Sequence, residues 1–491
     1  MKKSPRKCRS QAACKVLQGK SRFVIVAVDF AKSTMKVQAY LDRETVGWRR
    51  GLDVDNTQAG LSFLLEKLEG LCRKWQVDRK DLLFGGEDPG PYALPFIESL
   101  RRRGFLFVAV TAKAASRNRD NSRASSDLLD LDGIAETMRQ GIVRDIESSE
   151  SVYSELKRAC RARQQALESE TQAENQIRRL VDLAFPGLLD DKRSGLVPMG
   201  SACLALLASG ATPAKVLGMK DASLVQLLRR GGAYRPKAAA AAVRKAAEQA
   251  LEATPDPARI MEVLRHKIAT LRSLRAEIAC EELQMAHLLA QTPGVWLLTI
   301  PGVGVILAAS FVGELGDPVR WRSVDQIYSY AGCAQRQKQT GGPDKAPYSL
   351  GLPRDCNHRL KDALMQLSHH VGVALHPAAK AVGEDGDHRL RRHFREVEAR
   401  GGNSLLSTAR LLLRIAVPMV RDGRPYLQWD EDAEGVPGET LAAWMDATIA
   451  AAIAKFPKGS LKGIPKGASR IDDLQEFAKA YARTAKGLHR L

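Results

Sequence analysis

Strand-like apolar runs are confined to the first third of this chain. They are 23–30 (FVIVAVDF), 82–86 (LLFGG) and 105–110 (FLFVAV), and short continuous runs of this kind are typical of buried strands. Segments with the helical spacing of apolar residues lie between them, at 57–76 and 91–104. Because strands that alternate with helices form an α/β layer structure, the sequence predicts an α/β unit followed by an all-α remainder after about residue 146.

The chain divides by composition into five segments. Residues 1–21 are basic and contain no acid, so we expect a disordered arm. An α/β domain is predicted over 22–145, a helical and coiled-coil region over 146–290, and a second, mostly helical domain over 291–426. Residues 427–491 are a C-terminal extension that begins acidic and ends basic.

A heptad-like seam runs through the helical region, where residues step by four and three. Its positions are Ile260, Leu264, Lys267, Leu271, Leu274 and Ile278. Such a seam packs either against a second copy of the chain or against another helix of the same chain. The sequence leaves both alternatives open.

The net charge of +19, with a pI near 9.6, is the main compositional signal. Lys and Arg side chains that neutralise phosphates release counterions, so this surplus favours a polyanionic partner such as nucleic acid. A basic protein without such a partner is the alternative.

Cysteine usage and hydropathy point to the cytoplasm. The eight cysteines are scattered and form no CxxC pair, so neither a zinc site nor a disulfide framework is predicted. The N-terminus has no signal-peptide pattern. Residues 292–313 are uncharged and long enough to cross a bilayer, but Pro293, Pro301 and several glycines favour a turn instead. We therefore expect no membrane span.

Four acids in the first third have the positions of a two-metal nuclease site. Asp29 and Glu87 each follow a predicted strand, whereas Asp127 and Asp130 are three residues apart on a predicted helix that starts near Ser126. Carboxylates from strand ends and one helix can converge on two Mg²⁺ ions about 4 Å apart. Alternatively, the helix acids are merely solvated and Asp29 belongs to a turn.

Basic residues precede this helix in segment 111–124, which is predicted to be a loop. They are candidates for contact with the nucleic-acid backbone: Lys113, Arg117, Arg119 and Arg123.

A glycine turn in the second half is a second candidate contact. In LLTIPGVGVILAAS, Pro301 ends one helix, and Gly302 and Gly304 allow a tight turn before the next. The next helix would present free backbone amides to a phosphate, as in a helix-hairpin-helix element. An ordinary corner between two helices is the alternative.

A polar loop over 335–356 holds a hydroxyl next to glycines. Thr340 precedes Gly341, and Arg354 and Asn357 follow further along, so this segment could approach a phosphate closely. In isolation, such a hydroxyl more often bonds its own backbone.

Several blocks in order resemble one family, the DEDD transposases of the insertion-sequence-110 group, which are bridge-RNA-guided recombinases. The blocks are VDFAKST, EDPGPY, the Asp-x-x-Asp pair with Ile134 and Ala135, TIPGVGVILAASFVGELGD, YAGC, QTGG and LLRIAVPMVRDGRPY. The resemblance covers about residues 22–426, and the order of the blocks makes it specific.

The resemblance implies a fold, a cofactor and partners. The first domain would be RuvC-like with an RNase H-like fold, and its four acids would bind Mg²⁺. A serine of the second domain would attack DNA to form a covalent intermediate. The partners would be donor DNA, target DNA and a structured guide RNA, and the assembly a homodimer or homotetramer acting on the bacterial nucleoid.

The chain departs from the family pattern in the second domain. Thr340 stands where the family has its serine, and threonine offers the same hydroxyl with a more restricted rotation. Cys356 replaces a usual glycine before Asn357, and Ser349 is a second hydroxyl nearby. Three hypotheses follow: an RNA-guided recombinase, a junction-resolving nuclease that needs the acids but not Thr340, and a non-catalytic RNA- or DNA-binding scaffold.

Overall fold

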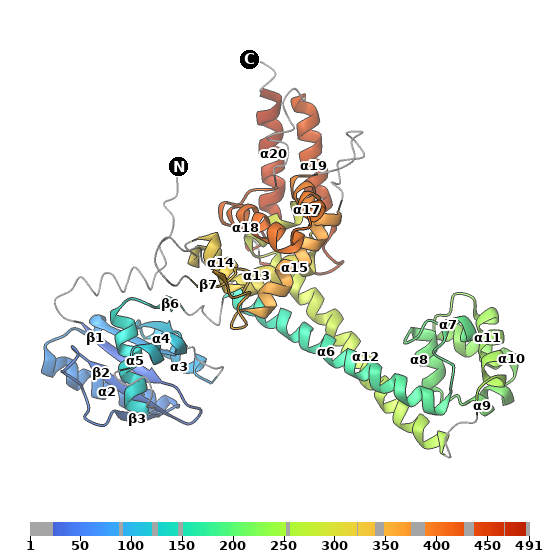
Figure 1. The fold of residues 1–491 in the computed structure, drawn as a ribbon, viewed down its shortest axis with the longest axis horizontal. Helices are drawn as coiled ribbons and strands as arrows, with labels where there is room; N and C mark the ends of the chain where they lie inside the picture. The colour runs from blue at the N-terminus through green and yellow to red at the C-terminus, as the bar shows by residue number, and fades with distance from the viewer. Residues whose placement is uncertain are drawn as a thin grey trace. The chain divides into compact units, whose positions relative to one another are not determined.

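The computed structural model describes residues 23–87, 92–119, 126–145, 151–251, 256–321, 323–338, 348–374, 388–426, 437–465 and 467–487. The chain forms two compact units (Figure 1). The first comprises Met1–Lys157, Leu288–Lys455 and Pro465–Leu491, and the second comprises Arg158–His287 and Phe456–Ile464.

A mixed six-stranded sheet organises the N-terminal part of the first unit. Its strands are β1 (Val24–Asp29), β2 (Thr34–Tyr40), β3 (Leu52–Asp55), β4 (Leu82–Glu87), β5 (Leu106–Val110) and β6 (Arg144–Asp145), in the order β3-β2-β1-β4-β5-β6. β1 pairs antiparallel with β2 and parallel with β4, and β4 pairs parallel with β5. β1 is therefore central, and the parallel strands β1 and β4 end at the same edge.

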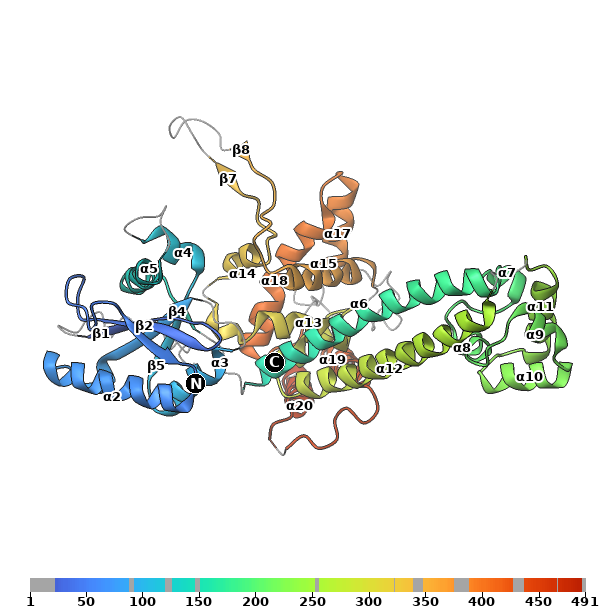
Figure 2. The same cartoon turned by 90° about the horizontal axis from the view of Figure 1, so that it is seen from below.

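Helices cover both faces of this sheet (Figure 2). The α2 helix (Gln58–Trp75) and the α3 helix (Leu94–Arg102) pack on one face, where their leucines meet Val24, Val26 and Val28. The α5 helix (Asp127–Arg139) packs on the other, against Ile25 and Ala27. The alternation of side chains along β1 thus gives each face its own apolar core.

Local sequence signals account for the helix boundaries. The Thr57 hydroxyl accepts from the Gly60 amide at the start of α2, and the Ser126 hydroxyl accepts from the Leu129 amide at the start of α5. Both predicted helices are confirmed. The 111–124 segment is not wholly a loop, because Thr111 caps a short helix, α4 (Ala112–Arg117).

Two long antiparallel helices, most of whose residues belong to the second unit, form its stem. They are α6 (Val152–Ala184) and α12 (Pro257–Leu289). Arg163 pairs with Glu282 at 2.8 Å, and Arg275 pairs with Glu170 at 2.7 Å, which sets the antiparallel register. A helix of the same chain therefore covers the seam of α12.

The residues that are buried along the seam differ from the prediction at one position. Leu264, Ile268 and Leu271 are buried, whereas Lys267 is only half-buried. A straight helix advances about 3.6 residues per turn, so Ile268 takes the place that a strict heptad gave to Lys267.

In the residues described between α6 and α12, the chain forms five short helices. They are α7 (Asp191–Ser194), α8 (Ser201–Ala208), α9 (Pro213–Gly218), α10 (Asp221–Arg230) and α11 (Pro236–Glu248). Their apolar residues share one core with the adjoining ends of α6 and α12. This small helical module is therefore built into the second unit.

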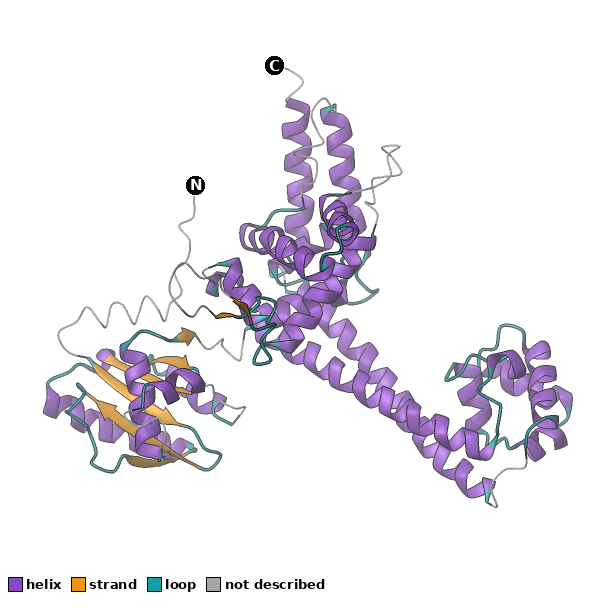
Figure 3. Cartoon of the chain, viewed as in Figure 1, coloured by secondary structure: helices purple, strands orange, loops and turns teal. Residues whose placement is uncertain are grey.

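The rest of the first unit is almost entirely helical (Figure 3). In chain order it contains η2 (Pro293–Thr299), α13 (Val305–Leu315), η3 (Pro318–Arg320), α14 (Val324–Tyr330), β7 (Gln337–Lys338), β8 (Tyr348–Ser349), α15 (His358–Val373), α17 (Arg389–Ala399), α18 (Ser404–Asp422), α19 (Gly438–Ala454) and α20 (Ile471–Gly487). In the described residues, no helix is both long and apolar enough to cross a membrane.

The C-terminal segment contributes to the core of this part. Trp296 of η2 packs edge-on against Phe477 of α20 with ring centroids 5.6 Å apart. The Lys455 ammonium donates to the carbonyls of Leu298 in η2 (2.7 Å) and of Val303 (2.9 Å), which lies between the two glycines of the turn. The C-terminal helices therefore support the turn that the sequence singled out.

Lys455 gives a prediction for pH-dependent stability. Burial lowers its pKa to about 8, from an ordinary value of 10.5. Because the folded pKa lies below the unfolded one, the unfolded chain holds more protons between these values, and the free energy of unfolding rises with pH in that window. A neutral amine can still donate to both carbonyls.

Between pH 8 and 10, we expect the free energy of unfolding of wild type to rise relative to that of a Lys455→Met variant, by up to about 1.4 kcal/mol per pH unit. Denaturant unfolding at each pH measures this difference. A difference that stays constant across the window would contradict the assignment.

Candidate active site

Two carboxylates leave the sheet at one edge. β1 and β4 are parallel neighbours whose register pairs Val28 with Gly86. The next residues along the two strands are Asp29 and Glu87, which end them. Both side chains therefore lie at the carboxyl edge of the sheet, as the sequence predicts.

The alternation of the strands places both acids on the same face. Ile25 and Ala27 belong to the core under α5, and Asp29 continues that side of β1. Leu83 belongs to the same core, and Glu87 continues that side of β4. The two carboxylates thus face the layer that contains α5.

The first turn of α5 supplies the other two acids, Asp127 and Asp130. Burial raises the pKa of Asp29 to about 6, and the negative charges of Asp130, Glu87 and Asp127 add to the increase. Burial, followed by the charge of Asp130, also raises the pKa of Glu87. The four predicted acids therefore lie close enough to repel one another.

An arginine lies among these acids. The Arg119 guanidinium is 2.6 Å from Asp130 Oδ1, and both side chains are largely buried, with 15% and 21% of their surface exposed. Its charge opposes the increase in the pKa of Asp29 and Glu87. Arg119 was predicted as a contact for nucleic acid, but here it partly neutralises the acid cluster.

Gly133 allows this approach. A Cβ atom at Gly133 would lie 2.4 Å from the Ala115 carbonyl oxygen and 2.9 Å from Arg119 Cγ. Only a residue without a side chain lets α5 pack this closely against α4 and the arginine that follows it. The sequence alone gives no sign of this requirement, because it depends on contacts across 14 to 18 positions.

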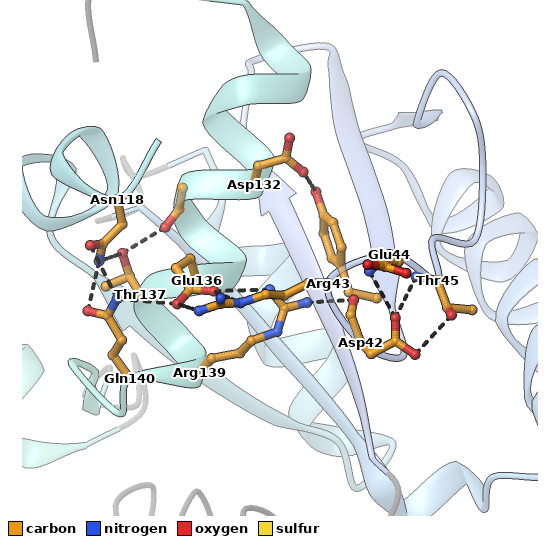
Figure 4. A network of polar contacts seen from close by, with 12 residues as sticks. Asp42, Arg43, Glu44, Thr45, Asn118, Asp132, Glu136, Thr137, Arg139 and Gln140 are labelled. Carbon is orange, nitrogen blue, oxygen red and sulfur yellow. Dashed lines mark hydrogen bonds and ion pairs between the residues drawn. The ribbon is translucent and has the colours of Figure 1, made fainter. Parts of the chain in front are cut away.

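Polar contacts fix α5 beside the acid cluster (Figure 4). The Tyr40 hydroxyl donates to Asp132 at 2.6 Å, and Arg43 pairs with Glu136 at 2.6 Å, joining β2 and its following turn to α5. Asn118, at the end of α4, donates to the Thr137 hydroxyl of α5 at 3.0 Å. These contacts hold the helix that carries Asp127 and Asp130.

The donor set fits a divalent cation in chemistry. Carboxylate oxygens are the hard ligands that Mg²⁺ prefers. Asp130 Oδ1 is buried and makes no hydrogen bond of regular geometry, although Arg119 lies beside it. Within the described part of the chain, no three acidic, histidine or cysteine side chains enclose a space for an ion. The acids would therefore have to move closer to bind one.

The other residues predicted in the first domain are only partly described. Lys113 and Arg117 lie on α4, next to the acid cluster along the chain. Arg123 lies outside the described residues, as do Thr340 and Gly341 in the second domain. The loop predicted over 335–356 contains a short antiparallel hairpin of β7 and β8, in which Ser349 pairs with Gln337.

Asn357 and Arg354 stand at the start of α15. The Asn357 side chain accepts from the Leu360 amide at 3.1 Å and donates to the buried Glu314 at 2.9 Å. It therefore caps α15 and joins it to α13. The Arg354 side chain is exposed. Contact of either residue with nucleic acid stays a prediction.

The two glycines of the turn have different environments. Gly302 has a φ of +80°, and a Cβ there would lie 2.6 Å from the His370 carbonyl oxygen. Gly304 caps α13 with an ordinary φ of −95°, and a Cβ there would meet nothing within 4 Å. The helix predicted before the turn is present as the short 3-10 helix η2, and α13 follows the turn.

This difference predicts unequal effects of alanine. Gly302→Ala should lower the free energy of unfolding by about 1–3 kcal/mol, because it combines a left-handed backbone with a steric clash. Gly304→Ala should lower it by less than about 1 kcal/mol. Chemical denaturation of both variants measures this, and equal losses would contradict the description of the turn.

Comparison with known proteins agrees with this arrangement. Residues 26–186 match the DEDD transposase model of the IS110 type, and residues 296–383 match the model of the IS116/IS110/IS902 transposase family. The two matches cover the acid cluster and the glycine turn, and together they span about half of the chain.

Two proteins of Streptomyces coelicolor are similar in sequence. An uncharacterized 43.6 kDa protein of insertion element IS110 is 26% identical over 312 residues, which is 62% of this chain and 72% of that protein. The candidate mini-circle transposase for IS117 is 27% identical over 259 residues, which is 50% of this chain and 62% of that protein.

The mixed α/β domain that carries the four acids lies within the residues that match the DEDD transposase model, which places the chain in the transposase class. The matches to both domain models show that this chain belongs to the IS110 family of transposases. An RNase H-like fold of the first domain is consistent with that family.

Proposed function

We propose that this chain is the recombinase of an insertion-sequence element, which cuts and exchanges DNA strands under the guidance of a structured RNA. The observation that carries the proposal is the cluster of Asp29, Glu87, Asp127 and Asp130, in which burial and then repulsion from neighbouring carboxylates raise the pKa of Asp29 and Glu87. A fold keeps such repulsion where function requires it, since it opposes stability.

The four acids are the proposed ligands of Mg²⁺, which would supply positive charge to the reacting phosphate. Ionised Asp29 and Glu87 carry the charge that attracts the cation, and the contacts of α5 with β2 hold Asp127 and Asp130 toward it. Arg119 balances part of this charge before the cation binds. In this proposal Arg119, Lys113, Arg117 and Arg123 also lie along the path of the DNA backbone.

The proposed nucleophile is the hydroxyl of Thr340. Its oxygen forms a bond to phosphorus as the bond between phosphorus and a sugar oxygen breaks. The hydroxyl proton passes to a base, and the departing sugar oxygen takes up a proton. The family resemblance supports this assignment through QTGG, and Gly341 would give the phosphate access to the hydroxyl. Gly302, Gly304, Arg354 and Asn357 are proposed to position nucleic acid.

The proposal of a guide RNA is tested by expressing the protein together with its native flanking DNA, purifying the protein, and sequencing the RNA that copurifies with it. We expect one discrete structured RNA from the flank. Bulk cellular RNA, or none, would contradict RNA guidance and favour a junction-resolving nuclease or a nucleic-acid-binding scaffold. Light scattering of the same sample tests the proposed homodimer or homotetramer, which a monomeric mass would exclude.

A further inference from the structure

The turn between α10 and α11 concentrates positive charge in the second unit. Its sequence from 229 to 237 is RRGGAYRPK, which holds four cations, one tyrosine and no acid. The surrounding helical module, residues 185–250, has ten Lys and Arg against four Asp and Glu. We call residues 229–237 the basic tip.

The cations of the basic tip are not used inside the protein. Arg229, Arg230, Arg235 and Lys237 are all exposed. In the described residues, no acid lies within ion-pair distance of any of them. Arg244 behaves differently, because it pairs with Asp221 at 2.7 Å and donates to the Met219 carbonyl at 2.6 Å. Arg244 is thus paired within the module, whereas the four tip cations are exposed and, among the described residues, have no acid beside them.

The tip also exposes an aromatic ring on a well-anchored turn. Tyr234 is 94% exposed, and the Arg235 guanidinium lies 5.9 Å from the centroid of its ring. Gly231 packs against α8, since a Cβ there would lie 2.8 Å from the Ala205 Cβ and 2.9 Å from the Ala202 Cα. The Ala233 amide donates to the Leu228 carbonyl at 3.0 Å. The exposure of Tyr234 is therefore a property of a fixed turn.

An open groove of about 690 Å³ continues from the tip between α10 and α11. Arg229 and Lys237 line it together with Gln226, Ala240 and the Arg244–Asp221 pair, in which the single acid of the lining is neutralised. A charged ligand that contacts the tip could therefore also rest along these helices. Cations spread over an open groove and a protruding turn suit an extended polyanion better than a small enclosed anion.

We propose that the basic tip and this groove bind the phosphate backbone of double-stranded DNA without reading its sequence. Duplex DNA carries one negative charge per roughly 1.7 Å of its axis, so the four free cations can each meet a phosphate. Tyr234 adds a hydroxyl and a flat ring for the backbone sugar. The choice of DNA over RNA rests on the proposed function, whereas the phosphate chemistry follows from the tip itself.

The test uses the full chain with four substitutions, Arg229→Gln, Arg230→Gln, Arg235→Gln and Lys237→Gln. The matched control carries the same loss of charge at exposed cations elsewhere in the second unit, namely Lys192→Gln, Lys245→Gln, Arg259→Gln and Arg272→Gln. Fluorescence anisotropy measures binding of a labelled 30-base-pair DNA duplex over a salt series, in EDTA so that no catalysis contributes. Circular dichroism confirms that both variants fold.

We expect the tip variant to bind at least about tenfold more weakly at 0.15 M salt, with a salt slope about 2–4 units shallower. The control should stay within about threefold of wild type, and Tyr234→Ala alone should weaken binding about twofold to fivefold. Equal losses in tip and control variants would overturn the proposal. A loss seen with an RNA duplex but not with DNA would also overturn it. Because EDTA prevents catalysis, a result that overturns DNA binding by the basic tip would not bear on the acid cluster or on the proposed function.

Discussion

Asp29→Asn should reduce recombination by at least about a thousandfold while the protein stays folded. Asp29 ends β1 at the centre of the acid cluster, and asparagine keeps its shape but removes its charge. A cation held by the proposed carboxylate ligands would lose both a ligand and part of the negative charge that attracts it. A plasmid recombination assay with matched donor and target sites measures the loss.

The same substitution should not destabilise the metal-free protein. Burial and the charges of three nearby acids raise the pKa of Asp29, which means that its negative charge opposes folding at neutral pH. Its removal should stabilise the fold by about 1 kcal/mol, once the shift is discounted for partial exposure. A lower unfolding temperature in EDTA would show that Asp29 has a structural role instead.

Asp132→Asn is the matched control on the same helix. Its side chain accepts the Tyr40 hydroxyl at 2.6 Å, and asparagine keeps an acceptor there. We expect recombination within about threefold of wild type. A loss as large as that of Asp29→Asn would mean that any change of charge on this layer disables the protein.

Thr340→Ala should also abolish recombination, whereas Thr340→Ser should retain at least about a tenth of wild-type activity. Alanine lacks the oxygen that would bond to phosphorus, so no covalent intermediate can form. Serine keeps the hydroxyl and removes the β-branch that restricts its rotation. The recombination assay compares the two, with Ser349→Ala as the control for the second hydroxyl of this segment.

These variants separate the candidate functions. A junction-resolving nuclease would tolerate Thr340→Ala but lose DNA cleavage with Asp29→Asn. A scaffold would bind nucleic acid equally well with either substitution. Full recombination by Thr340→Ala would exclude Thr340 as nucleophile and direct attention to Ser349.

Local sequence patterns predicted the parts of the site that depend on neighbouring residues. The apolar run before Asp29, the cap at Ser126 and the three-residue step from Asp127 to Asp130 each determine a local structure. Together with the parallel pairing of β1 and β4, they place all four acids at one edge.

Long-range contacts account for what the sequence did not predict. The position of Arg119 beside Asp130 requires Gly133 and the short helix α4. The composition of the segment that contains α4 is typical of a loop, so the sequence did not predict this helix. Lys455 supports the glycine turn from more than 150 residues away, and no local pattern reports such a contact. The strand β3 was also missed, because only one of its four residues is buried.

Covalent catalysis by Thr340 is tested most directly by incubating wild-type protein, its RNA and labelled DNA with Mg²⁺, denaturing the mixture, and separating protein from DNA. We expect a protein–DNA adduct that survives denaturant, is absent in EDTA and with Asp29→Asn, and maps to the peptide containing Thr340. Cleaved DNA with free ends and no adduct would contradict the covalent mechanism.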